Sequence, residues 1–115
     1  MASKKESTGK ALYKIIFLNH GKVYELYCES VGTSGLWGFI EVAELVFETG
    51  EGLVVDPTEE KMRQEFSGAR VLHLPMHCVL RVEEVEKRGK CLIRDRESGE
   101  KVTPFPISPP SRSQS

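Results

Sequence analysis

Apolar and polar residues alternate with a period of two along most of the chain, which is the pattern of half-buried β-strands. The pattern is clearest over residues 12–18 and 23–29, two β-branched and aromatic runs on either side of Asn19 and Gly21. Because Asn and Gly tolerate the positive φ of tight turns, the two runs predict a β-hairpin. One face of its second strand would hold Tyr24, Leu26 and Cys28.

A second pair of extended segments covers residues 76–86 and 91–95, with polar residues 87–90 between them. The alternation predicts a strand, a turn and a return strand, entered through a break at Pro75. An inward face is expected to hold Cys78, Leu80 and Val82. We expect this face to close a single apolar interior and to leave the outer surfaces of the protein for contact with a partner. The other predictions depend on this expectation.

Further strands are predicted at residues 39–47, 53–55 and 69–74, and one helix at residues 57–66. Asp56 is suited to the N-cap and Pro57 to the first helical position, which together mark the start of a helix. Gly68 is suited to the C-terminal cap. Met62 and Phe66, four residues apart, form a narrow apolar stripe that would dock on the sheet.

We therefore predict an α+β protein, mainly β: a small, strongly bent antiparallel sheet or barrel of about six strands with one short helix. The chain of 115 residues is long enough for one domain, expected over residues 11–95. Residues 1–10 are polar and predict a flexible leader. Residues 96–115 are rich in Pro and Ser and predict a disordered tail with polyproline character.

Charge and location narrow the classes of partner. The net charge is −1, and because residues 1–10 carry +2 and residues 96–115 carry +1, residues 11–95 carry −4. An acidic folded part does not favour general binding to a phosphate backbone. No apolar run reaches the ~20 residues of a membrane-spanning helix, so we expect a cytoplasmic protein that does not bind membranes.

No reaction and no cofactor are indicated by the motifs of the chain. Residues with metal-binding side chains lack ligand spacing, so no metal site is expected, and the thiols are interpreted as reduced core residues: His20, His73, His77, Cys28, Cys78 and Cys91. Catalysis by His77 with Glu83 or Cys91 is a minor alternative to a non-enzymatic protein. The glycines at positions 32, 35 and 38 match no phosphate-binding motif.

Binding is the better hypothesis, and the loop that carries Trp37, the single tryptophan, is its centre. The large apolar surface of Trp37 favours burial as a lid on the core, with an exposed contact residue as the alternative. The first hypothesis is an adaptor that docks an unknown protein partner through this loop and an open strand edge. The second is an RNA-binding barrel of Sm-like or oligonucleotide-binding style. The oligomeric state stays open, and the candidate binding residues are Trp37, Phe39, Tyr27, Lys22, Arg81, Lys87, Arg88 and Lys90.

Four segments resemble a family of small proteobacterial proteins known as domain of unknown function 1820. They are YKIIFLNHGKVYELY at residues 13–27, GFIEV at 38–42, VDPTEEK at 55–61 and PMHCVLRVEEV at 75–85. The resemblance covers about residues 11–95. It implies a compact cytoplasmic bacterial protein and supplies no catalytic residue.

Overall fold

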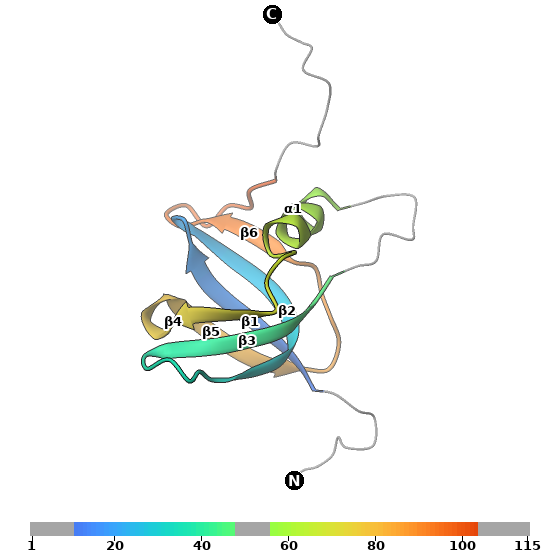
Figure 1. Ribbon diagram of the computed structural model, residues 1–115. Helices are drawn as coiled ribbons and strands as arrows, with labels where there is room; N and C mark the ends of the chain where they lie inside the picture. The colour runs from blue at the N-terminus through green and yellow to red at the C-terminus, as the bar shows by residue number, and fades with distance from the viewer. Residues whose placement is uncertain (1–10, 48–55, 104–115) are drawn as a thin grey trace, which may run out of the picture.

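The computed structural model describes residues 11–47 and 56–103. One antiparallel sheet contains all six strands, and one helix lies over its end (Figure 1). The elements, in chain order, are β1 Leu12–Asn19, β2 Lys22–Thr33, β3 Phe39–Val46, α1 Pro57–Glu65, β4 Val71–Pro75, the 3₁₀-helix η2 Met76–Cys78, β5 Val79–Val85 and β6 Leu92–Asp95. The predicted fold class is confirmed, with a bent sheet that does not close into a barrel. The strand predicted at residues 53–55 lies outside the described residues.

The first hairpin forms as predicted. Its two central residues, His20 and Gly21, have φ values of 55° and 77°, so both lie in the left-handed region that type I′ turns require. Asn19 pairs with Lys22 to close the turn. The turn geometry fixes the register of β1 against β2, and this register places Ile15 opposite Leu26 in the interior.

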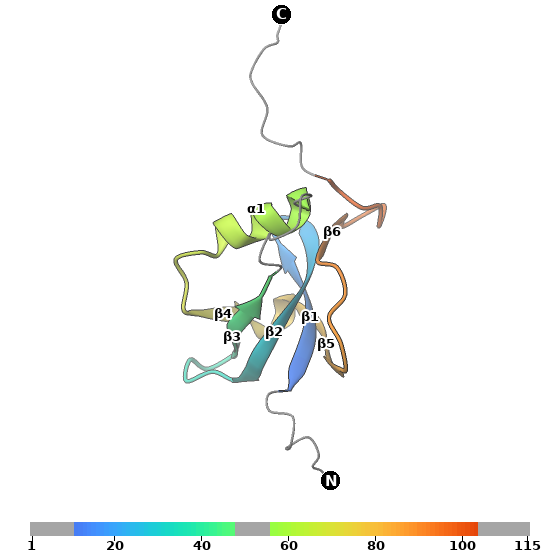
Figure 2. The same cartoon turned by 90° about the vertical axis from the view of Figure 1, so that its right-hand side faces the viewer.

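Strand β2 is the centre of the fold. One of its edges pairs with β1, and the other edge pairs with β6 near its start and with β3 near its end. Five consecutive residues, 24–28, are buried, so both faces of the strand are covered. Figure 2 shows α1 lying across the upper end of the bent sheet, beside β6. The aromatic ring of Tyr27 packs against the segment that joins β5 to β6, where a Cβ on Gly89 would come within 2.7 Å of the Tyr27 hydroxyl.

The hairpin predicted for residues 76–95 is wrong. Strand β5 pairs with β1 and strand β6 pairs with β2, so the two strands lie on different neighbours. Cys78 belongs to η2, and the side chains of Leu80 and Val82 are 52% and 39% exposed. Alternation along a strand shows that two faces differ, but it does not show which strand will pair with it or what will cover either face.

Residues other than Cys78, Leu80 and Val82 form the buried interior. Ile15, Leu26 and Cys28 are fully buried, and the hydrophobic core consists of Ile15, Phe17, Tyr24, Leu26, Tyr27, Cys28, Val42, Met62, Cys91 and Ile93. Complete burial of a leucine or phenylalanine side chain contributes about 1.5–3 kcal/mol. The central hairpin and α1 therefore supply most of the core, and β5 lies at its margin.

Helix α1 begins as its sequence predicted. The Asp56 carboxylate accepts a hydrogen bond from the Thr58 backbone N–H at 2.9 Å, and Pro57 occupies the first turn. Met62 is fully buried, and the ring of Phe66 meets that of Tyr24 edge to face at 6.2 Å. The helix ends at Glu65 with Phe66 as its C-cap, so Gly68 does not cap it. None of the helices in the described part of the chain is long and apolar enough to span a membrane.

Two ends of the sheet are open. The strand order is β4-β3-β2-β1-β5, so among the described strands β4 and β5 each have one hydrogen-bonded neighbour. Residues 96–103, which the sequence analysis assigned to the tail, turn back on β6. The Val102 N–H donates a hydrogen bond to the Ile93 carbonyl at 2.7 Å, and Arg94 forms an isolated antiparallel β-bridge with Lys101. The predicted leader and residues 104–115 of the predicted tail lie outside the described residues.

Candidate functional site

The exposed large apolar side chains lie in two neighbouring segments. They are Leu36 at 52%, Trp37 at 95%, Met76 at 49%, and Leu80 and Val82 on β5. The Met76 N–H donates to the Gly38 carbonyl at 2.8 Å, which joins the β2–β3 loop to η2 at the start of β5. We call Leu36, Trp37, Met76, Leu80 and Val82 the exposed apolar set.

The β2–β3 loop is ordered by its own hydrogen bonds. The Phe39 N–H bonds the Leu36 carbonyl at 3.2 Å, and Gly38 adopts a φ of +82° that a side chain would strain. Ser34 Oγ accepts from the Leu36 N–H at 2.9 Å and shares a 2.6 Å hydrogen bond with His73 Nδ1 on β4. The loop therefore holds Trp37 outward on a fixed backbone.

The expected burial of Trp37 is wrong. The tight turn at residues 36–38 points the indole away from the sheet, and it is 95% exposed. The apolar area of a side chain indicates how much its burial would stabilise the protein. Burial also requires a neighbouring element that covers the side chain. The structure shows the alternative, an exposed side chain.

The other predicted binding residues are dispersed over the molecule. Tyr27 is buried in the core, and Phe39 is half-buried at the start of β3. Three of the five cations bond carboxylates: Arg81 with Glu83 at 2.7 Å, Arg88 with Glu59 at 2.8 Å and Lys90 with Asp56 at 3.4 Å. Lys87 is exposed, and Lys22 lies at a separate cleft.

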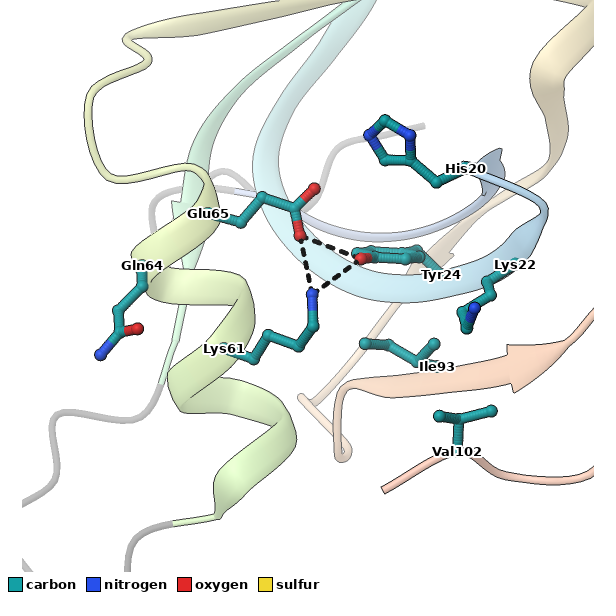
Figure 3. Close-up of a pocket in the computed structure, with 8 residues that line it drawn as sticks. All are labelled: His20, Lys22, Tyr24, Lys61, Gln64, Glu65, Ile93 and Val102. Atoms are coloured by element: carbon teal, nitrogen blue, oxygen red, sulfur yellow. Dashed lines mark hydrogen bonds and ion pairs between the residues drawn. The ribbon is translucent and has the colours of Figure 1, made fainter. Parts of the chain in front are cut away.

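This cleft, of about 580 Å³, lies between α1, the β1–β2 turn and β6 (Figure 3). At its back is a hydrogen-bonded cluster of three side chains. The Tyr24 hydroxyl donates to Glu65 Oε1 at 2.9 Å, and Lys61 Nζ donates to both groups at 3.4 Å. Asn19 Nδ2 donates to the other oxygen of Glu65 at 3.0 Å. The remaining lining residues are His20, Lys22, Gln64, Ile93 and Val102.

These contacts shift the pKa values of Tyr24, Glu65 and Lys61 away from their usual values. Burial, followed by the hydrogen bond and charge of Glu65, raises the pKa of Tyr24 above its usual range. Burial acts to raise the pKa of Glu65, but hydrogen bonds from Asn19 and Tyr24 outweigh it and lower the pKa. Burial acts to lower the pKa of Lys61, but Tyr24 and Glu65 outweigh it and raise the pKa. Tyr24 is therefore neutral, and Glu65 and Lys61 are charged, at neutral pH.

This cluster was not predicted from the sequence. Tyr24 was expected on one face of the first hairpin, and neither Lys61 nor Glu65 was a candidate site residue. The available signal was the spacing of Lys61 and Glu65, because residues four apart share one side of a helix. Nothing in the local pattern showed that Tyr24 of β2 would lie between them.

The two buried thiols, Cys28 and Cys91, have raised pKa values in the structure. Burial raises the pKa of Cys28 to about 11 and that of Cys91 to about 12, so both are neutral thiols at physiological pH. His77 makes no hydrogen bond or ion pair with a described residue and therefore none with Glu83 or Cys91. The described residues contain no group of three or more His, Cys, Asp or Glu side chains placed to hold a metal ion.

Comparison with protein families places the chain. The model of the domain of unknown function DUF1820 matches residues 11–107. The chain belongs to the DUF1820 family. The match extends beyond the predicted boundary at residue 95 and includes residues 96–103 that fold back on β6. No curated protein and no solved structure matches this DUF1820 domain.

Proposed function

We propose that this DUF1820 domain is a non-enzymatic adaptor that binds an extended, apolar segment of a partner protein along the open edge of β5, beside Trp37. The observation that supports the proposal most strongly is the 95% exposure of the single tryptophan on an ordered loop. Tryptophan is among the residues that contribute most to protein–protein binding. A loop that is already ordered loses little conformational entropy when a partner binds.

Strand β5 has the features of a strand-accepting edge. It pairs only with β1 among the described strands, so no described strand pairs with the backbone donors and acceptors of its other edge. Leu80 and Val82 are two residues apart on this strand and both are exposed. An added strand would gain backbone hydrogen bonds from the edge and apolar contacts from these side chains.

The charges on β5 favour a foreign strand over a second copy of the same strand. Arg81, Glu83 and Glu84 interrupt the apolar positions, and charged residues on an edge oppose uncontrolled pairing. The Arg81–Glu83 ion pair, at 2.7 Å, lies on the strand itself. A partner strand would match β5 if its apolar residues alternate with charged residues and if each charge lies opposite a β5 charge of the other sign.

The test is affinity purification with matched variants, followed by reconstitution. Wild type, Trp37→Ala, Leu80→Lys and the control Lys101→Ala are used as bait in extracts of the native host. A partner retained by wild type and the control, but lost with both other variants, is then purified. Its addition should shift the fluorescence of Trp37 to shorter wavelength, because the indole leaves water, and Trp37→Ala should weaken binding by about 30-fold or more.

Unchanged recovery of every protein with Trp37→Ala and Leu80→Lys would overturn the proposal. Light scattering of the purified chain covers the case of self-association. A wild-type dimer that Leu80→Lys converts to a monomer would assign the edge to a second copy and also contradict a foreign partner.

RNA binding is the second proposal, and it depends on the cations Lys22 and Lys87. The Lys22 side chain makes no hydrogen bond or ion pair with the described residues, and Lys87 is exposed. The carboxylate partners of Arg81, Arg88 and Lys90 weigh against it, because each would have to be displaced. The proposal predicts retardation of single-stranded RNA that weakens steeply with salt, and no retardation at low salt would exclude it.

A further inference from the structure

A second surface, separate from the exposed apolar set, has the properties of a small-molecule site. We propose that the cleft between α1, the β1–β2 turn and β6 binds a small organic anion whose charged group lies between Lys22 and His20 and whose apolar body rests on Ile93 and Val102. The shared chemistry is one carboxylate or phosphate on an aryl or acyl body. The cleft volume of about 580 Å³ is within the range of ~300–1,000 Å³ typical of ligand pockets.

The balance of charge in the cleft favours an anion. Two lysines, Lys22 and Lys61, line it together with a single carboxylate, Glu65. Donors from Asn19, Tyr24 and Lys61 already bond that carboxylate, at 3.0, 2.9 and 3.4 Å. With His20 neutral, the lining residues therefore carry a formal charge of +1, although the chain as a whole carries −1.

Lys22 and His20 have donor capacity that the described residues do not use. Neither side chain makes a hydrogen bond or ion pair with a described residue. Lys22 lies opposite Asp95 in the β2–β6 ladder. Backbone N–H groups of Ser98 and Glu97 chiefly lower the pKa of Asp95, and the charge of Lys22 adds a smaller effect. The ammonium group therefore acts on Asp95 through space and keeps all three donors for a ligand.

One side of the cleft provides an apolar surface for the body of the ligand. Figure 3 shows Ile93 and Val102 on one side and the hydrogen-bonded group of Tyr24, Lys61 and Glu65 on the other. The hydrogen bond from the Val102 N–H to the Ile93 carbonyl, at 2.7 Å, holds the two apolar residues together. These groups are already ordered, so a ligand would meet a largely preformed surface.

The test follows backbone amide shifts of the full ¹⁵N-labelled chain during titration with benzoate and with phenyl phosphate. Both probes should saturate and should move the amides of Lys22, Tyr24, Gln64 and Val102. Benzyl alcohol tests the need for charge, and inorganic phosphate tests the need for an apolar body. Both are expected to bind at least about tenfold more weakly, since each lacks one of the two contacts. Stronger binding of either aryl anion identifies the head group that the cleft prefers.

Matched variants assign the binding to the cleft. Lys22→Met keeps the apolar stem and removes the charge, and it should weaken benzoate binding about three- to tenfold. His20→Asn preserves the turn, because Asn tolerates positive φ, and it should also weaken binding. The control Lys87→Met removes an equal charge outside the cleft and should leave binding unchanged.

Three results would overturn the proposal: titrations that do not saturate, equal weakening by Lys22→Met and Lys87→Met, or equal affinity for benzyl alcohol and benzoate. Dispersed amide spectra of each variant confirm that it remains folded. The readout is independent of the adaptor proposal, because Trp37 and β5 do not line this cleft.

Discussion

At the scale of single residues, the charged side chains that look solvated in the sequence include several that organise the interior. Glu59 is 4% exposed and Glu25 is 8% exposed. Arg88 Nη1 donates to Glu59 Oε2 at 2.8 Å, and Glu59 also accepts from the Cys91 N–H at 3.4 Å. A carboxylate buried to this extent must be paired, because an isolated one would lose several kcal/mol of hydration. Arg88 therefore links the β5–β6 segment to the first turn of α1.

Removing Arg88, whose side chain is 19% exposed, should destabilise the fold. Arg88→Met is expected to lower the free energy of unfolding by about 2–4 kcal/mol, because it removes a guanidinium that lies 2.8 Å from the buried Glu59 carboxylate. The control is Lys90→Met, whose partner Asp56 is 3.4 Å away and whose own side chain is 77% exposed. Lys90→Met should lower the free energy of unfolding by less than about 1 kcal/mol. Urea unfolding measures both, and equal small losses would contradict a structural role for the Arg88–Glu59 pair.

At the scale of the elements, α1 depends on what it docks against. It has nine residues, and isolated helices of this length are marginal in water. Its contacts with the rest of the fold include buried Met62 and the cluster of Tyr24, Lys61 and Glu65. The apolar stripe was visible in the sequence, whereas the polar contact depends on the position of β2.

The polar contact makes the docking of α1 sensitive to pH. The pKa of Glu65 is lowered in the fold, so its contribution to stability is present above its ordinary value of 4.5 and is lost as the pH falls through the folded value. The pKa of Tyr24 is raised, so its contribution is complete below 10.0 and is lost as the pH rises through the folded value.

Glu65→Gln isolates the acid limb of this dependence. Wild type should exceed the variant in stability by less than about 1 kcal/mol near neutral pH, because the cluster is partly solvated. The difference should shrink as the pH falls below 4.5. Urea unfolding from pH 3 to 7 measures it, and a constant difference over this interval would show that Glu65 does not contribute as a carboxylate.

At the scale of the whole molecule, the sheet is most stable in the middle and open at both ends. Strand β2 has neighbours on both edges and buried residues on both faces, whereas β4 and β5 end the sheet. Opening β2 would disrupt the core, but opening an end strand would expose only part of it. The proposed partner surface therefore lies on the part of the sheet that opens most easily.

Hydrogen exchange should follow this gradient. Amides of residues 24–28 in β2 are expected to exchange slowest, at the rate of global unfolding, and those on the outer edge of β5 to exchange much faster. Exchange resolved by residue in NMR measures both. Protection of the outer β5 amides equal to that of β2 would mean that the edge is covered, which would remove the basis for strand addition.

The sequence by itself determined the local elements. The hairpin turn with positive φ at Gly21, the Asp56 cap and the stripe of Met62 and Phe66 depend on neighbouring residues and are confirmed. The other residue with positive φ in this turn is His20 and not Asn19, which ends β1. The mainly β class also followed from the alternation of residues, and six of the predicted strands are present among the described residues. These features are encoded within a few residues, so one chain is sufficient to predict them.

Only the tertiary structure decided how the strands pair and which faces are covered. Leu80 and Val82 alternate as core residues do, but they lie exposed because β5 occupies an end of the sheet. Trp37 is outward because no element of the described residues packs over its loop, and Tyr24 meets Lys61 and Glu65 because α1 crosses β2. Each outcome depends on contacts between segments that are distant in the sequence, and local periodicity contains no information about them.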